Sequence, residues 1–136
     1  MITWKEMLCS YKESEIDPKH LPNMKDLHNK VQKLRTAYGK PMTPTNCYRS
    51  MTHHLRIYKD KGITDIRLIP MKSKHLEALA IDFADPDGEL HDWCKSNTKV
   101  LEDIGLWLEE RQGGWQHFQS TPFGSYKKGG TIWFKP

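Results

Sequence analysis

The 136-residue sequence has no apolar run approaching the roughly 20 residues that cross a bilayer. It has only three cysteines, Cys9, Cys47 and Cys94, and no pair of them is spaced as C-x-x-C. The odd number and the spacing argue against a disulfide framework and against a cysteine zinc finger. We therefore expect the three cysteines to be small buried apolar side chains. Internal repeats and low-complexity segments are absent as well.

Length and composition are typical of one ordinary folded domain. Hydrophobic residues make up 37% of the chain and charged residues 28%, which does not resemble a disordered sequence. We assign residues 1–136 to a single domain, in which residues 1–20 form an N-terminal helix and loop extension. Lys5 and Glu6 interrupt the first apolar residues, so the amino terminus does not resemble a signal peptide. We expect synthesis in the cytoplasm.

The net charge of +4 favours a polyanionic partner only weakly. Nucleic acid, teichoic acid, acidic peptidoglycan and lipopolysaccharide would all satisfy it. The positive residues are dispersed, and Lys127 and Lys128 form the only notable basic pair near the C-terminus. A solvated, mildly basic surface explains the charge equally well.

The apolar pattern predicts a mixture of helices and strands. The strongest helix runs from Asn23, as its N-cap, to Tyr38, where Gly39 and Pro41 end it. Further helices are expected at residues 3–11, 52–61, 89–96 and 99–104, and strands at 42–48, 78–83, 106–110, 115–119 and 131–134. Because the strands are concentrated in the second half, we predict an α+β fold with a small antiparallel sheet and helices packed on one side.

Two histidines and one aspartate form a candidate metal site. In the strand at 78–83, Asp82 lies on the face opposite to the apolar residues, and a buried carboxylate there needs a partner. His75 enters just before this strand, and His117 lies in the middle of another. Two imidazoles and one carboxylate, with a fourth position for water, are typical of catalytic zinc. A hydrogen-bonded histidine at position 117 is the alternative.

Three separated segments resemble one enzyme family. Ser73, His75, Ala80 and Asp82 match the S-x-H-x-x-G-x-A-x-D signature of the zinc D-Ala-D-Ala carboxypeptidases and L-alanyl-D-glutamate peptidases (LAS-type metallopeptidases). Cys47-Tyr48-Arg49-Ser50 resembles the G-Y-R-S element of that family, and Trp115-Gln116-His117 resembles its W-x-H element. Order and spacing agree from about residue 20 to residue 136. The small form is most similar to versions encoded by tailed bacteriophages.

The resemblance implies a hedgehog/DD-peptidase-like fold and a zinc ion held by His75, Asp82 and His117. It implies that Arg49 either stabilises the oxyanion of the tetrahedral intermediate or binds a substrate carboxylate. A surface salt bridge is the alternative for Arg49. Ser73 would line the substrate site, unless it only caps the turn before His75, and Trp115 could form a wall of the substrate groove.

The departures from the family pattern concern proton transfer. Ala78 and Cys47 replace glycines, which are mild changes. The positions at which relatives carry an acid or a second histidine are Gly114 and Trp115 here, and neither can move a proton. Other relatives have Asp at the position of Gln119, and an amide can orient water but cannot act as a base.

A glutamate from the neighbouring strand could replace the missing base. If residues 106–110 and 115–119 form a hairpin, a four-residue loop pairs Glu110 with Trp115, and a five-residue loop pairs Glu109 with Trp115. Either register places one glutamate on the face of His117. We prefer Glu109 as the general base, and the alternative is two solvated glutamates near a turn.

The expected function is a zinc peptidase that hydrolyses peptide bonds in peptidoglycan stem peptides during phage lysis of the host. Its type would be a D-Ala-D-Ala carboxypeptidase or an L-Ala-D-Glu endopeptidase. We expect a monomer whose partner is peptidoglycan, without nucleic acid and without stable membrane association. It would accumulate in the cytoplasm of the infected cell and reach the periplasm or cell wall at lysis. The alternatives are a non-catalytic zinc-stabilised wall-binding or virion module and, on charge alone, a nucleic-acid-binding protein.

Overall fold

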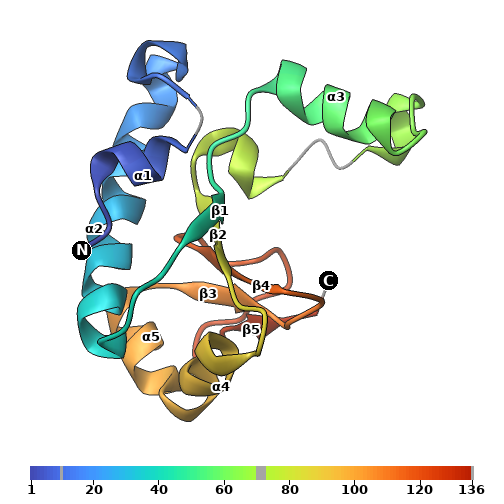
Figure 1. Ribbon diagram of the computed structural model, residues 1–136. Coiled ribbons are helices and arrows are strands. Elements are labelled where there is room, and N and C mark those ends of the chain that lie inside the picture. Colours follow the sequence, from blue (N-terminus) through green and yellow to red (C-terminus); the bar gives the residue numbers. More distant parts are fainter. Residues whose placement is uncertain (10, 70–72, 136) are drawn as a thin grey trace.

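The computed structural model describes residues 1–9, 11–69 and 73–135, which form a mixed α+β fold around a five-stranded sheet (Figure 1). The helices are α1 (Trp4–Leu8), α2 (Leu21–Tyr38), α3 (Met51–Asp60), α4 (Glu89–Ser96) and α5 (Thr98–Ile104). The strands are β1 (Pro44–Asn46), β2 (Ala80–Ala84), β3 (Trp107–Glu109), β4 (Trp115–Gln119) and β5 (Trp133–Phe134). Within the described ranges, no helix is long and apolar enough to cross a membrane.

The sheet is antiparallel except at one edge. Its strand order is β1-β2-β4-β3-β5, and β3 pairs with β5 in parallel, so the expectation of a purely antiparallel sheet is wrong. Trp107 pairs with Gln119, so β4 ends beside the start of β3. A chain that leaves from that end and passes β3 adds its next strand in the same direction as β3. The short strand β1, which begins at a proline, lies at the other edge of the sheet, where a residue without an N–H group is tolerated.

The two faces of the sheet differ as the alternating pattern predicts. Ile81, Phe83, Leu108 and Phe118 are fully buried on one face and belong to the same core as the apolar stripe of α2, which comprises Met24, Leu27, Val31 and Leu34. Burying each such side chain contributes about 1.5–3 kcal/mol. Asp82, on the alternate position of β2, therefore lies on the opposite face, which the core does not fill.

Helix α2 begins three residues earlier than its sequence predicts, because its N-cap is His20 rather than Asn23. It starts at Leu21 with Pro22 in its first turn, and Asn23 is helical rather than the N-cap. The Asn23 side chain instead donates a hydrogen bond of 3.0 Å from Nδ2 to the Glu77 carbonyl oxygen. This contact ties the helix to the turn that precedes β2. The predicted C-terminal stop is confirmed, because Gly39 has a left-handed φ of 76°.

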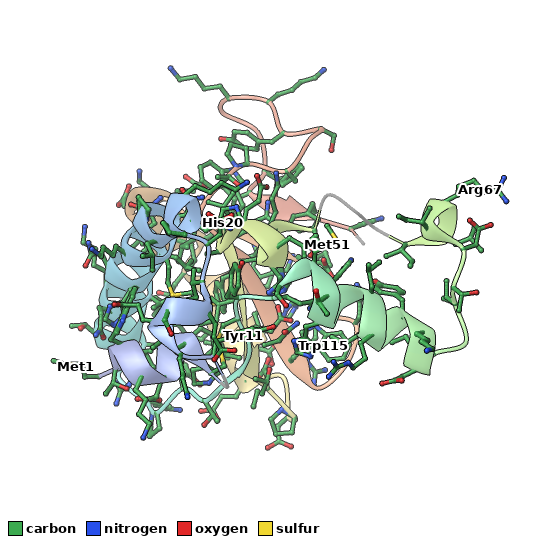
Figure 2. The ribbon with its side chains drawn as sticks, turned by 90° about the horizontal axis from the view of Figure 1, so that it is seen from above. Met1, Tyr11, His20, Met51, Arg67 and Trp115 are labelled. Carbon is green, nitrogen blue, oxygen red and sulfur yellow. A yellow bond between two sulfur atoms is a disulfide. The ribbon has the colours of Figure 1, made fainter. Side chains whose placement is uncertain are left out.

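Helix α3 is an exception to the prediction that the helices pack on one side of the sheet. It projects from the body of the protein together with the following turn η3 (Ile66–Leu68), and Arg67 marks the outer end of this arm (Figures 1 and 2). Only His54 of the ten residues of α3 is buried. The helix lacks the wide apolar stripe that would seat it against the core.

The cysteines do not behave as three buried thiols. Cys9, which follows α1, and Cys47, which follows β1, form a disulfide across a sequence separation of 38 residues, with their Cα atoms 6.5 Å apart. Cys94 is a free buried cysteine, as expected. The prediction is therefore wrong for Cys9 and Cys47, because their spacing in the chain does not reveal that the N-terminal extension lies beside β1. The bridge links that extension to the segment that enters the site.

Candidate metal centre

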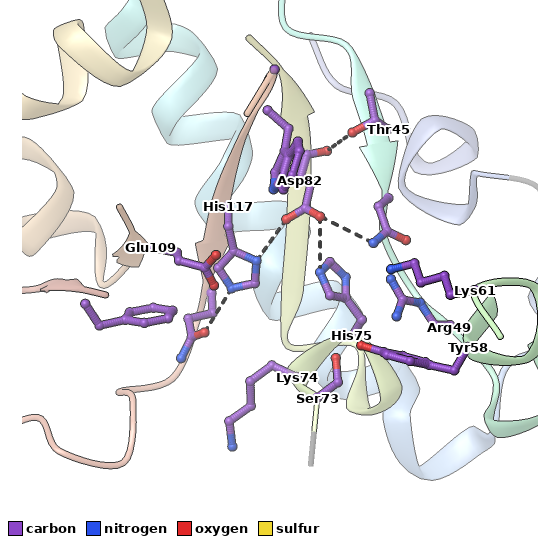
Figure 3. A pocket seen from close by; sticks show the side chains of 15 residues that line it. Thr45, Arg49, Tyr58, Lys61, Ser73, Lys74, His75, Asp82, Glu109 and His117 are labelled. Atoms are coloured by element: carbon purple, nitrogen blue, oxygen red, sulfur yellow. Dashed lines mark hydrogen bonds and ion pairs between the residues drawn. The ribbon is translucent and has the colours of Figure 1, made fainter. Parts of the chain in front are cut away.

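His75, Asp82 and His117 come together on the open face of the sheet (Figure 3). His117 Nδ1 lies 2.8 Å from Asp82 Oδ1, and His75 Nε2 lies 3.4 Å from Asp82 Oδ2. Each residue offers one ligand atom, and the three atoms lie within 4.8 Å of one another. The three side chains that the sequence selects are thus neighbours in space, although they are up to 42 positions apart in the chain, between residues 75 and 117.

The sheet register and one turn place these ligands. Asp82 pairs directly with His117 in the antiparallel ladder of β2 and β4, so their side chains lie side by side on one face. His75 comes from the 3-10 turn η4 (Lys74–Glu77), which ends at Ala78. Ala78 has a left-handed backbone with φ 59° and ψ 32°, and this turns the chain from η4 into β2.

Neighbouring groups orient both imidazoles. His75 Nδ1 lies 2.7 Å from the Cys47 carbonyl oxygen, which can only accept, so this nitrogen carries the proton. Gln119 donates from Nε2 to the Thr121 carbonyl oxygen at 2.9 Å, and its Oε1 therefore accepts from His117 Nε2 at 3.0 Å. These contacts direct the remaining nitrogens, His75 Nε2 and His117 Nδ1, toward Asp82.

Asp82 is held as a carboxylate. Burial by itself raises the pKa of this carboxyl, but the adjoining rings of His117 and His75 outweigh burial and keep the pKa well below its usual range. Burial likewise lowers the pKa of His117, whereas the hydrogen bond and charge of Asp82 raise it more, so the net pKa is higher than usual. Asn46 Nδ2 also donates to Asp82 Oδ2 at 3.3 Å.

This donor set fits a metal ion. Two imidazole nitrogens and one carboxylate oxygen converge, and the second nitrogen of each ring is engaged by an acceptor, as metal-binding histidines usually are. The prediction that these three residues could hold a metal ion is confirmed at this level.

A cavity of about 760 Å³ opens in front of the three side chains and is lined by Arg49, Ser73 and Trp115, among others. Arg49 Nη1 contacts His54 Nδ1 at 3.0 Å, whereas Arg49 Nε is buried without a hydrogen-bond partner in the described chain. The guanidinium faces the cavity and makes no ion pair among the described residues, so the surface salt bridge considered for it is wrong. The Ser73 side chain makes no capping hydrogen bond.

Trp115 forms an exposed wall of this cavity. Its side chain is 40% exposed, which is unusual for so large an apolar group. A Cβ atom added at Gly113 would lie 2.5 Å from the Trp115 ring. Glycine at this position therefore allows the indole to lie against the hairpin loop.

Glu109 lies in the metal cavity, and Glu110 does not. Leu108 pairs with Phe118, and continuing this register places Glu109 opposite His117 and on the same face. Both predicted hairpin registers, which paired Glu110 or Glu109 with Trp115, are wrong by one or two residues. Glu110 instead forms an ion pair with Lys95 of α4. The Glu109 carboxylate accepts a hydrogen bond from Gln112 and borders the cavity beside His117.

Two residues of the site, Gln119 and Asn46, have roles that the family pattern does not indicate. Their contacts show that both hold metal-site side chains in place: Gln119 the ring of His117, and Asn46 the carboxylate of Asp82. The alternation of β4 could have indicated Gln119, because residues 117 and 119 share a face. Asn46 could not be found in this way, because its contact depends on the irregular pairing of β1 with β2.

Replacing Gln119 by Leu is expected to weaken metal binding about 10- to 100-fold, the usual cost of losing a contact outside the ligand set. Leucine has similar volume but leaves His117 Nε2–H without its acceptor, so one of the two polar contacts that orient the ring is lost. Competition with a chromophoric chelator measures the affinity, and Gln32→Leu is the matched control, because the Gln32 amide lies on α2 and contacts Ile2 rather than the site. Unchanged affinity in Gln119→Leu would show that His117 needs no such orientation.

No family model, no curated protein and no solved structure matches this chain. The function must therefore be inferred from the geometry of the site and from the residues that form it.

Proposed function

We propose that the protein is a zinc-dependent peptidase that hydrolyses peptide bonds in peptidoglycan stem peptides. One observation carries the proposal: the three segments that resemble LAS-type peptidases converge on a single open cavity. Arg49 donates its backbone N–H to the His75 carbonyl oxygen at 3.0 Å, and Asp82 pairs with His117 across the sheet. The three segments, which resemble the family in sequence order, therefore lie together in space and direct polar side chains into the same cavity.

The backbone at Ala78 supports the same proposal. The family signature has glycine at this position, and here the residue adopts a left-handed conformation with φ 59°. Glycine is the residue that reaches this region without a steric cost, whereas a Cβ atom costs about 1–2 kcal/mol. The left-handed turn therefore explains why the family signature has glycine at this position. Ala78 adopts the same conformation at a modest cost in free energy. The position of the turn, directly between His75 and Asp82, matches the role of that glycine.

Zinc is the metal that suits these ligands best. Calcium and magnesium prefer all-oxygen sites, whereas two imidazoles with one carboxylate are a common set for catalytic zinc. Bound zinc supplies Lewis-acid polarisation of a carbonyl group and activation of water near neutral pH. An open cavity beside the ligands, rather than a fourth protein ligand among the described residues, is what a catalytic site requires.

The remaining cavity residues have distinct roles in this proposal. The Arg49 guanidinium donates hydrogen bonds to the oxygen that becomes negative in the transition state, or to a carboxylate of the substrate. The Glu109 carboxylate accepts a proton from the water that attacks the scissile carbonyl carbon and gives it to the amine that leaves when the C–N bond breaks. Ser73 and Trp115 border the space in which the peptide lies.

The finer assignments follow from the same resemblance. We propose a hedgehog/DD-peptidase-like fold, with α2 and α5 behind the sheet and the metal site in front of it. A monomer that acts on the wall when a phage lyses its host is consistent with an exposed site formed by one chain. Both stem-peptide cleavage types, carboxypeptidase and endopeptidase, are candidates.

Incubation with purified sacculi tests the proposal. The zinc-loaded protein is expected to release free amine groups, and a chelator is expected to stop the release until zinc is added back. Mass spectrometry of the released muropeptides identifies the bond. No release of amine groups by the zinc-loaded protein would contradict the proposal, and sedimentation with sacculi under those conditions would favour the non-catalytic wall-binding module.

A further inference from the structure

A second hollow adjoins the metal cavity. It has a volume of about 450 Å³, and aromatic side chains of the 120–134 segment form its lining, including Phe123, Tyr126 and Phe134. Phe134 lines both this hollow and the metal cavity. The Phe134 ring centre lies 5.9 Å from that of His117 and 5.0 Å from that of Phe123. Only the Phe134 side chain would therefore separate a ligand in the hollow from His117.

The aromatic rings of this hollow form a connected surface. Phe123 contacts Tyr126 edge to face, with ring centres 5.6 Å apart, and Tyr126 in turn packs against Trp107. Phe123, Tyr126 and Phe134 are each only partly buried, although rings of this size usually pack inside when no ligand needs them. The aromatic surface is thus apolar and accessible, and Trp107 packs against it through Tyr126.

The charged side chains that line the hollow are both positive. From residue 120 to the end, the sequence contains three lysines and no aspartate or glutamate. Lys127 and Lys135 line the hollow, and Lys128 adjoins it in the chain. Among the described residues, none of these three lysines forms an ion pair. Their ammonium groups are therefore available as hydrogen-bond donors to a ligand.

We propose that this aromatic hollow binds the amino-sugar strand of peptidoglycan. Pyranose rings have flat C–H faces that pack on aromatic rings, and lysine ammonium groups donate to hydroxyl and acetamido oxygens. Muramic acid units without a peptide also carry a carboxylate, which complements the lysines. This inference rests on the proposed function, because the adjoining metal site is what identifies peptidoglycan as the source of the sugar.

The position of the hollow also orients the substrate. If the sugar lies beside Phe134, the first residues of the stem peptide lie beside His117, and the cut falls near the glycan end of the stem. Bases of single-stranded nucleic acid can stack on aromatic rings beside lysines as well. The adjoining metal cavity favours the glycan, and the experiment includes the nucleic acid as an arm.

Calorimetric titration with soluble, peptide-free, N-acetylated glycan strands tests the inference in the presence of a chelator. Phe123→Leu keeps the apolar volume but removes the ring face, and it is expected to weaken glycan binding about tenfold, as loss of one good aromatic contact does. Lys33→Gln, an exposed lysine on α2, is the matched control and should bind like the parent. No binding by the parent protein, equal binding by Phe123→Leu, or tighter binding of an oligothymidylate of the same length would overturn the proposal.

Because the chelator removes zinc, the glycan-binding result does not depend on whether the protein is a peptidase. Glycan binding that depends on Phe123 supports the hollow even if sacculi are not cut. In the cleavage arm, Phe123→Leu should raise KM about tenfold for a stem peptide attached to its sugar and leave KM unchanged for the same peptide alone. Equal effects on both substrates would overturn the sugar-binding role, while turnover itself would still support the peptidase.

Discussion

Replacing Asp82 by Asn is expected to lower zinc affinity by more than about 100-fold. Loss of a contact outside the ligand set costs up to about 100-fold, and loss of a ligand should cost more. Asp82 is the one anionic ligand of the group, and both imidazoles face its carboxylate. Asparagine has the same size but no charge, so it neither neutralises a divalent cation nor holds the two rings by ion pairing. Turnover on sacculi should fall with the bound metal.

The metal content of the purified protein, measured by mass spectrometry of the element, gives the first result. Circular dichroism shows whether the fold is kept, and Asp92→Asn, at an exposed position of α4, is the matched control. One equivalent of zinc bound by Asp82→Asn with parental affinity would disprove the assignment of this group as the metal site.

Replacing Glu109 by Gln is expected to lower kcat by about 10²- to 10⁴-fold, the range supplied by a general base, while zinc stays bound. Glu109 lies opposite His117 in the register of β3 and β4 and borders the cavity. The amide has the same shape but cannot take up a proton. Retained zinc distinguishes this defect from that of Asp82→Asn.

Glu110→Gln is the control for this experiment, because Glu110 is paired with Lys95 outside the cavity. Its kcat should stay within about twofold of the parent, since loss of a surface ion pair costs little. Turnover that is intact in both glutamate variants would mean that no glutamate of this hairpin acts as the base. A larger loss in Glu110→Gln than in Glu109→Gln would reverse the assignment.

Features with a strong local pattern were predictable from the sequence. The alternation of β2 correctly separates Ile81 and Phe83 from Asp82, because neighbouring residues of a strand point to opposite faces. Helix α4 begins and ends where its pattern places it. The mixed α+β class follows from the same local patterns.

Features that depend on contacts between distant segments were not predictable. The hairpin register of β3 and β4 depends on the conformation of its loop, in which Gly113 accommodates the Trp115 ring. Asn23 resembles a helix cap in the sequence, but its side-chain partner is the Glu77 carbonyl oxygen, 54 residues away. The disulfide between Cys9 and Cys47 and the parallel pairing of β5 likewise require the folded chain.

The central groups of the site lie on the sheet, and other segments line the space around them. This arrangement affects how the selectivity of the site can change. Asp82, His117 and Glu109 are fixed by adjacent rungs of one backbone ladder, whereas the projecting arm of α3 lines the outer part of the metal cavity and the 120–130 loop lines the adjoining hollow. Insertions or exchanges in those peripheral segments can therefore reshape what the site accepts without moving its central groups relative to one another. Grafting an arm or loop of different length onto this sheet is accordingly a rational first route to altered selectivity.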